Sequence, residues 1–157
     1  MKIIQFKNSA FKDHRGFYWT SWIKKQYPKL EFNHDKFSIS KKNVLRGLHG
    51  DSKSWKLVSC VFGEVFFVIV NYDKKSKDFF KKKTFKLSHK NRLQILVPPK
   101  YLNGFLCLSS ECVFHYKWSY KGKYNDVKNQ FSVKWNDKNL NIKWPLKGKP
   151  ILSKRDK

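Results

Sequence analysis

A histidine and an arginine stand three residues apart in one apolar segment of the chain. Segment 44–49 reads Val-Leu-Arg-Gly-Leu-His and runs into Gly50, where we expect a turn. Strict alternation of side chains would put Arg46 on the same face as Leu48. A charge on an apolar face needs an anionic partner or water, and a ligand phosphate would supply that partner. His49 can exchange a proton near neutral pH. From this segment alone, an arginine that reaches the surface and an ordinary strand-end histidine explain the pattern equally well.

Two further side chains could transfer protons. Tyr116 alternates with polar residues between Phe114 and Trp118, so it would share the inner face of a strand with two aromatic neighbours. Its hydroxyl then needs a hydrogen-bond partner, either in the protein or in a substrate, and a partner in the protein is the more common arrangement. Asp156 is a carboxylate close to the end of the sequence, where a solvated tail is usual. The residues alone leave both roles open.

Two other catalytic chemistries lack the residues that they require. The histidines are dispersed and never form an H-x-H pair, so we predict no metal site; they are His14, His34, His49, His89 and His115. A serine hydrolase is unsupported because the sequence contains no nucleophile elbow.

The charge balance bears on the class of partner. Lys+Arg 35 minus Asp+Glu 11 gives a formal net charge of +24. The excess is lysine spread along the whole chain, without the arginine patch or groove-reading helix of a sequence-specific reader, so we predict no specific nucleic-acid partner. A basic surface favours an anionic small substrate. A polyanion-binding β module is the alternative that would explain the charge by itself.

Chain length, cysteine spacing and hydropathy bear on the number of domains and on the cellular compartment. At 157 residues with 17% aromatic content, the chain is expected to form one folded domain over residues 1–157. Cys60, Cys107 and Cys112 have no C-x-x-C spacing and lie in apolar runs, so we expect buried thiols in a reducing compartment. No segment resembles a signal core or a membrane span, and a cytoplasmic protein without a membrane partner is the expectation.

Short strands separated by turns dominate the chain, which predicts an all-β sandwich or barrel with little helix. One short helix is expected at 22–27, before Pro28. A strand at 3–6 has no partner nearby in sequence. The other expected strands are 17–20, 37–40, 44–49, 56–61, 65–70, 84–88, 94–97, 104–108, 112–119, 131–135 and 141–144.

A series of motifs resembles one family in order and spacing from residue 11 to the C-terminus. They are D-H-R-G-F at 13–17, S-K-K-N-V-L-R-G-L-H at 40–49, K-L-V-S-C at 56–60 with G-E-V at 63–65, Y-K at 116–117, W-N-D at 135–137, W-P at 144–145 and L-S-K-R-D at 152–156. The family is that of the nucleotide-sugar 3,5-epimerases of the dTDP-4-keto-6-deoxyglucose type. The resemblance implies a cupin-type jelly-roll fold, no cofactor, and a homodimer with exchanged N-terminal strands.

The resemblance also implies roles for individual residues. His49 falls on the catalytic base, Asp156 on the carboxylate that orients it, and Tyr116 on the proton donor across the sugar ring. Positions that hold the substrate's diphosphate or sugar are matched by Arg15, Arg46 and Lys56. These residue types suit the reaction, since a C4 ketone acidifies the hydrogens at C3 and C5 and an imidazole can remove one of them.

Departures from the deoxyhexose enzymes suggest a different sugar. Those enzymes read Gln-Asp-Asn where this chain has His34-Asp35-Lys36, and Ala-His-Gly-Phe where it has Asn103 in place of the histidine. They also read His-Phe/Tyr-Gln where this chain has His49-Gly50-Asp51. These features look like the branch that acts on GDP-4-keto-heptoses in bacterial capsule heptose biosynthesis, so His34, Lys36 and Asn103 are expected to contact substrate.

The resulting hypothesis is an epimerase that inverts C3, or C3 and C5, of GDP-D-glycero-4-keto-D-lyxo-heptose. The alternatives are a dTDP-4-keto-6-deoxyglucose 3,5-epimerase of rhamnose biosynthesis and a non-catalytic polyanion- or sugar-binding cupin.

Overall fold

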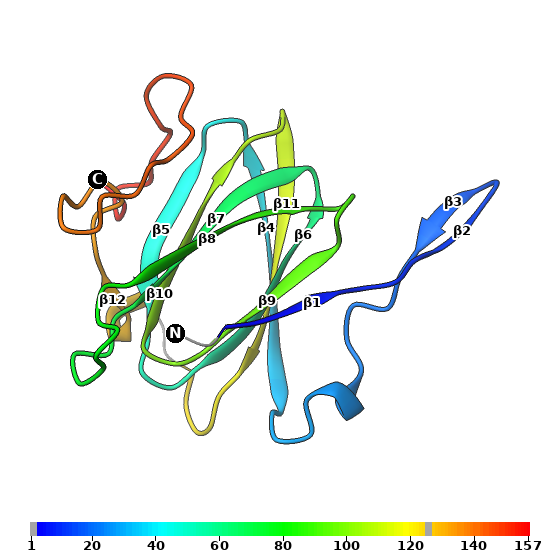
Figure 1. Cartoon of the computed structure of the whole chain (residues 1–157), viewed down its shortest axis with the longest axis horizontal. Helices are drawn as coiled ribbons and strands as arrows, with labels where there is room; N and C mark the ends of the chain where they lie inside the picture. The colour runs from blue at the N-terminus through cyan, green and yellow to red at the C-terminus, as the bar shows by residue number, and fades with distance from the viewer. Residues whose placement is uncertain (1–2, 125–126) are drawn as a thin grey trace.

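The computed structural model describes residues 3–124 and 127–157. Two five-stranded antiparallel sheets face each other, and a small hairpin extends from one side (Figure 1). The first sheet has the order β1-β9-β6-β11-β4 and the second has the order β12-β5-β10-β7-β8. The strands are β1 (Ile4–Lys7), β2 (Phe11–Asp13), β3 (Gly16–Tyr18), β4 (Phe32–Lys41), β5 (Leu45–Gly50), β6 (Trp55–Phe62), β7 (Glu64–Asn71), β8 (Lys82–Ser88), β9 (Leu93–Val97), β10 (Tyr101–Cys107), β11 (Glu111–Ser119) and β12 (Phe131–Ser132). The predicted all-β jelly-roll sandwich with little helix is confirmed.

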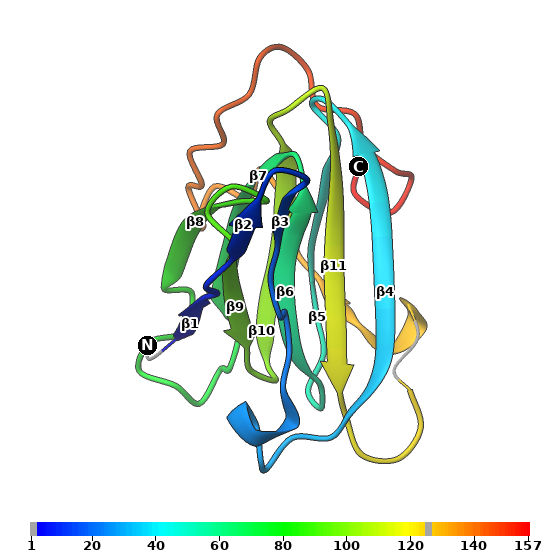
Figure 2. The ribbon, with the colours of Figure 1, turned by 90° about the vertical axis from the view of Figure 1, so that its right-hand side faces the viewer.

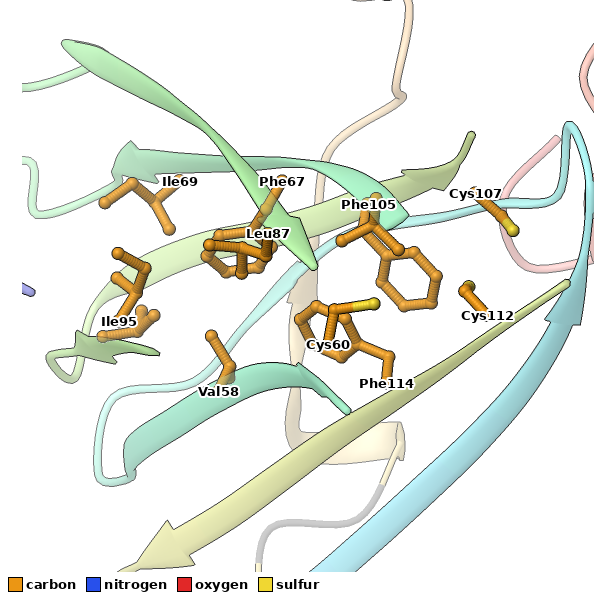
Figure 3. Close-up of a cluster of buried hydrophobic side chains, with 12 residues drawn as sticks. Val58, Cys60, Phe67, Ile69, Leu87, Ile95, Phe105, Cys107, Cys112 and Phe114 are labelled. Atoms are coloured by element: carbon orange, nitrogen blue, oxygen red, sulfur yellow. The ribbon is translucent and has the colours of Figure 1, made fainter. Parts of the chain in front are cut away.

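The main core fills the space between the two sheets. Figure 3 shows Val58 and Ile95 of the first sheet meeting Phe67, Ile69 and Phe105 of the second. All of these side chains are fully buried, as expected where two inner faces of a sandwich interdigitate.

The three cysteines belong to this core, and each is free and buried, as predicted (Figure 3). Burial raises the pKa of the Cys60 thiol to about 12. Burial also raises the pKa of Cys112. Both thiols are therefore protonated at neutral pH.

Irregular segments cover the outer face of each sheet. Tyr27 packs with Leu57 and Leu96 on the first sheet. Leu140 packs with Val68 and Val70 on the second. These coverings explain why apolar side chains recur in stretches that form little regular structure.

Two sequence-based assignments of secondary structure are wrong for this reason. The predicted helix at 22–27 is a single 3₁₀ turn, η1 (Lys24–Gln26), and no side chain caps its N-terminus. The predicted strand at 141–144 is not paired; Ile142 and Trp144 lie against the covered face of the second sheet while their neighbours are exposed. An extended segment laid over a sheet alternates as a strand does. A second 3₁₀ turn, η2 (Val127–Asn129), precedes β12.

The N-terminal region differs from the expected arrangement. Strand β1 pairs with β9 of its own chain, with Ile4 opposite Leu96, so it is not the unpaired strand that the sequence suggested. The β2–β3 hairpin is the element that projects from the sandwich (Figure 1). Its Phe11 and Tyr18 rings stack on each other and are 70% and 63% exposed. Within the described part of the chain, no helix is long and apolar enough to cross a membrane.

Candidate active site

A β-bulge in β5 brings Arg46 and His49 to the same cavity. In the pairing with β10, Arg46 lies opposite Phe105 and His49 opposite Asn103, so three steps on β5 match two steps on β10. The extra residue breaks the alternation, and the prediction that Arg46 and Leu48 share a face is wrong: Leu48 is fully buried in the core and Arg46 is exposed.

Gly47 makes the bulge possible. Its φ is +122°, and a Cβ at this position would lie 2.6 Å from the Cα of Gly104. Only glycine combines this backbone conformation with such close contact between strands. The glycine of the L-R-G-L-H motif therefore permits the geometry that places its arginine and its histidine in one cavity.

His49 forms a short hydrogen bond with Asp156. The His49 Nε2 atom lies 2.6 Å from Asp156 Oδ1. An ionised carboxylate only accepts hydrogen bonds, so this geometry assigns the ring proton to Nε2 and the lone pair to Nδ1. The Ser132 hydroxyl is 2.8 Å from Nδ1 and is positioned to donate to it. In its neutral form, His49 therefore presents Nδ1 as its acceptor nitrogen.

Asp156 is held in place rather than frayed, although it is the penultimate residue. Ile151 bridges to Val44 beside the start of β5, which returns the last residues to this strand. The Ser153 hydroxyl donates to Asp156 Oδ2 over 2.7 Å. Burial alone would raise the pKa of Asp156, but hydrogen bonds from His49 and Ser153 keep it below its ordinary value. The carboxylate therefore stays ionised and can stabilise a protonated His49.

Tyr116 lines the same cavity as His49. Burial raises the pKa of its phenol, so the hydroxyl keeps its proton at neutral pH. A protonated phenol is the form that can return a proton to a carbanion.

Lys56 brings a positive charge to the cavity. Its Nζ lies 3.0 Å from Asp51 Oδ2, and both side chains are almost fully buried. Burial lowers the pKa of Lys56, and the Asp51 carboxylate offsets part of that effect. Burial by itself would raise the pKa of Asp51, but Lys56 and the backbone N–H groups of Lys53 and Ser54 lower it overall. The Gly50-Asp51 step thus supplies the counterion for a buried lysine.

Asn103 also lines this cavity, on the strand next to His49. Its Nδ2 donates to the backbone carbonyl of His49 over 2.9 Å. The amide oxygen remains as an acceptor for a ligand hydroxyl.

Other residues predicted to contact substrate lie outside the cavity wall. His34 and Lys36 are on β4 next to it: His34 stacks on Tyr124 with a ring separation of 4.7 Å, and Lys36 donates to the Tyr124 hydroxyl. Arg15 lies in the turn of the β2–β3 hairpin, is 76% exposed, and pairs with Asp13. The fold does not bring Arg15 to the cavity of its own chain.

The cavity is small, and the groups that line it differ from those of a larger hollow nearby. It has a volume of about 110 Å³ and is lined by Arg46, Gly47, His49, Lys56, Asn103, Tyr116, Trp118 and Gln130. A larger hollow of about 710 Å³ lies near Trp55 and Tyr120, but it contains no histidine–carboxylate pair. In the part of the chain that the structure describes, no three histidine, cysteine or carboxylate side chains gather as a metal site.

Sequence reasoning missed several residues around His49. Ser132 gave no signal because it contacts His49 only through the pairing of β12 with β5. Ser153 precedes Asp156 within the last motif, and its spacing could have suggested a local hydrogen bond. Trp118 was considered only as an aromatic neighbour of Tyr116, yet it also lines the cavity.

Comparison with known proteins gives one consistent family. A family model described as dTDP-4-dehydrorhamnose 3,5-epimerase matches residues 1–157. The protein of that name from Shigella flexneri is 37% identical over 98% of this chain and 87% of its own length.

Solved structures agree with this match. A dTDP-6-deoxy-D-glucose-3,5-epimerase from Legionella pneumophila, in complex with dTDP-4-keto-L-rhamnose, has a TM-score of 0.91 and 34% identity, covering 99% of this chain and 89% of that chain. A dTDP-4-dehydrorhamnose 3,5-epimerase from Bacillus anthracis with TDP and PPi bound has a TM-score of 0.89 and 32% identity, covering 97% and 89%. These names support a nucleotide-sugar epimerase, but they do not support the predicted closer likeness to GDP-heptose enzymes.

Proposed function

Because the chain belongs to the dTDP-4-dehydrorhamnose 3,5-epimerase family and is an isomerase of nucleotide-linked 4-keto sugars, we propose that it inverts C3 and C5 of dTDP-4-keto-6-deoxyglucose. The observation that carries the proposal is the hydrogen-bonded His49–Asp156 pair in a cavity that Tyr116 also lines. The names of the relatives favour this deoxyhexose over the GDP-heptose.

Proton removal is assigned to His49. The C4 ketone of the substrate acidifies the neighbouring C–H bonds, and the Nδ1 lone pair accepts the proton once the Ser132 hydroxyl turns away. The Asp156 carboxylate, 2.6 Å from Nε2, then stabilises the imidazolium. Carbon–hydrogen cleavage at C3 or C5 leaves an enolate with negative charge on the C4 oxygen.

Charge stabilisation and proton return fall to other cavity residues. The Lys56 ammonium and the Arg46 guanidinium supply positive charge for the enolate and the diphosphate. Tyr116 donates its hydroxyl proton to the face of the ring opposite His49, which inverts the centre. All of these proton transfers use side chains of the protein, and the proposal requires no cofactor.

GDP-D-glycero-4-keto-D-lyxo-heptose is the second candidate, and Asn103 is the observation that favours it. With Nδ2 engaged by the His49 carbonyl, the amide oxygen of Asn103 is an acceptor beside the reacting sugar. A heptose carries additional hydroxyl groups that could donate to this oxygen, whereas the deoxyhexose carries a methyl group at C6.

Solvent exchange distinguishes these substrates. We expect the enzyme, incubated in D₂O with dTDP-4-keto-6-deoxyglucose, to replace the C3 and C5 hydrogens with deuterium, as followed by proton NMR. A parallel incubation with the GDP-4-keto-heptose is the control. Exchange confined to the heptose would transfer the proposal to the second candidate, and exchange with neither sugar would overturn the epimerase function for both.

We further propose that the chain works as a homodimer in which the β2–β3 hairpin reaches the partner's cavity. The projecting hairpin with exposed rings and Arg15 in its turn supports this arrangement. Mixing subunits provides the test. The variants Arg15→Ala and His49→Asn are each expected to lose activity, and co-refolding the two should restore one intact site in every mixed dimer. If Arg15 acts within its own chain, mixing restores nothing, and a monomer in light scattering contradicts the dimer directly.

A further inference from the structure

Trp118 lies between the proton-transfer residues and an aromatic–lysine cluster. It is two positions beyond Tyr116 on β11, so both side chains lie on the same face of the first sheet. Across the sheet, Trp118 is opposite His34 on β4 and Lys56 on β6. Figure 2 shows β11 running beside β4 along this part of the sandwich.

The indole N–H of Trp118 lacks a hydrogen-bond partner among the residues that the structure describes. The residue is 6% exposed and lines the cavity that contains His49 and Tyr116. A buried donor without a partner costs free energy, and this cost is removed when a ligand supplies an acceptor. The position of Trp118 in the cavity wall makes the substrate the natural source of that acceptor.

Two lysines define the kind of acceptor that fits. The Lys56 ammonium lies 4.6 Å from the centre of the Trp118 ring, and the Lys36 ammonium lies 5.2 Å from it. Two cations over the same indole ring favour an anionic oxygen over a neutral hydroxyl as the acceptor. The diphosphate is the anionic part of a nucleotide sugar, and it is bonded directly to the sugar that Tyr116 and His49 would act on.

We propose that Trp118 is a substrate-binding residue whose indole N–H donates to a diphosphate oxygen, between Lys36 and Lys56. This inference rests on the proposed function, which supplies a diphosphate-linked substrate. Trp118 would bind the diphosphate without taking part in proton transfer.

The variant Trp118→Phe tests the contact because it removes the N–H and retains an aromatic ring. A hydrogen bond to a charged group corresponds to roughly a 10- to 100-fold change in Kd. We therefore expect Trp118→Phe to weaken binding of the free nucleoside diphosphates, dTDP or GDP, by about that factor in calorimetric titrations at fixed salt. The KM of the sugar nucleotide should rise in parallel while kcat changes little.

Trp22 provides a matched control. Its indole N–H is also buried and without a partner among the described residues, and the Lys117 ammonium lies 5.3 Å from its ring. Trp22, however, packs with Tyr27 and Leu57 on the outer face of the same sheet. Trp22→Phe should therefore leave both the Kd and the KM unchanged.

The outcomes separate this inference from the proposed function. An unchanged Kd for both nucleoside diphosphates in Trp118→Phe overturns the inference, as does weakening that is confined to the sugar nucleotides, which would place the N–H on the sugar. Binding of dTDP or GDP by the wild type without solvent exchange of any 4-keto sugar overturns the proposed function alone. If the wild type binds neither nucleotide, both are overturned.

Discussion

Replacing His49 with asparagine is expected to slow deuterium exchange at C3 and C5 of the 4-keto sugar by about 10²- to 10⁴-fold, the usual contribution of a general base. The asparagine amide ends near the position of Nδ1, so it can keep a contact with the Ser132 hydroxyl, but it does not reach Asp156 as Nε2 does and it cannot accept a proton from carbon. Proton NMR in D₂O measures the rate, and circular dichroism checks that the fold is intact.

Tyr116→Phe is the informative comparison for that variant. The phenyl ring fills the same space but cannot return a proton, so the rate of inversion should fall. Exchange of the hydrogen that His49 removes should continue. If the His49→Asn variant exchanges these hydrogens at the wild-type rate, His49 is not the base. Complete loss of exchange in Tyr116→Phe would instead show that the tyrosine has a structural role.

The second large effect concerns stability and arises at Asp51. Asp51→Asn keeps a side-chain oxygen for the N–H groups of Lys53 and Ser54 but leaves Lys56 buried without a counterion. Removing one partner of a buried ion pair typically costs about 3–5 kcal/mol. For a chain of this size the midpoint of thermal unfolding should fall by roughly 6–20 °C. Differential scanning calorimetry at pH 7 measures the change.

The pH dependence identifies the cause of that loss. The pKa of Asp51 is lowered in the folded protein, so its stabilisation is present at neutral pH and is lost as the pH falls below about 4. This acid-sensitive contribution should be absent in Asp51→Asn. Lys56 has a lowered pKa, which falls further without Asp51, so the unfolded chain binds more protons and the variant should regain stability as the pH rises toward 10.

A double variant completes this test. Lys56→Met in the Asp51→Asn background removes the unpaired charge and should recover much of the lost stability. A thermal midpoint for Asp51→Asn equal to that of the wild type would mean that the buried pair contributes no net stabilisation.

Local patterns in the sequence were sufficient to predict most strands but not the layers that cover them. The strands that became β6, β7 and β11 have apolar runs or alternation that pairing in a buried sheet requires. Segment 141–144 has the same alternation because it lies over the second sheet, and no local pattern distinguishes pairing from covering. The start of β4 at Phe32 was missed because polar residues dominate its first half, where the strand borders the cavity.

Site residues that belong to sequence motifs could be predicted, whereas contacts that depend on the pairing of distant strands could not. His49, Tyr116 and Asp156 were identified through family motifs, and the fold places Asp156 against His49 and Tyr116 in the wall of the same cavity. The bulge that brings Arg46 and His49 together depends on the register between β5 and β10, which the sequence of β5 alone does not specify. Ser132 is 83 residues from His49 in the sequence, and no local pattern predicts a contact between them.

The buried cysteines make it possible to measure how often the sandwich opens. A thiol reagent attacks the thiolate, and in the closed sandwich burial of Cys60 and Cys112 suppresses both the thiolate and access to it. Modification must therefore proceed through conformations in which the two sheets have separated. Labelling kinetics would read the frequency of those openings in the natural sequence, without substrate and without an introduced probe, and so distinguish a loosened core from a disabled active site.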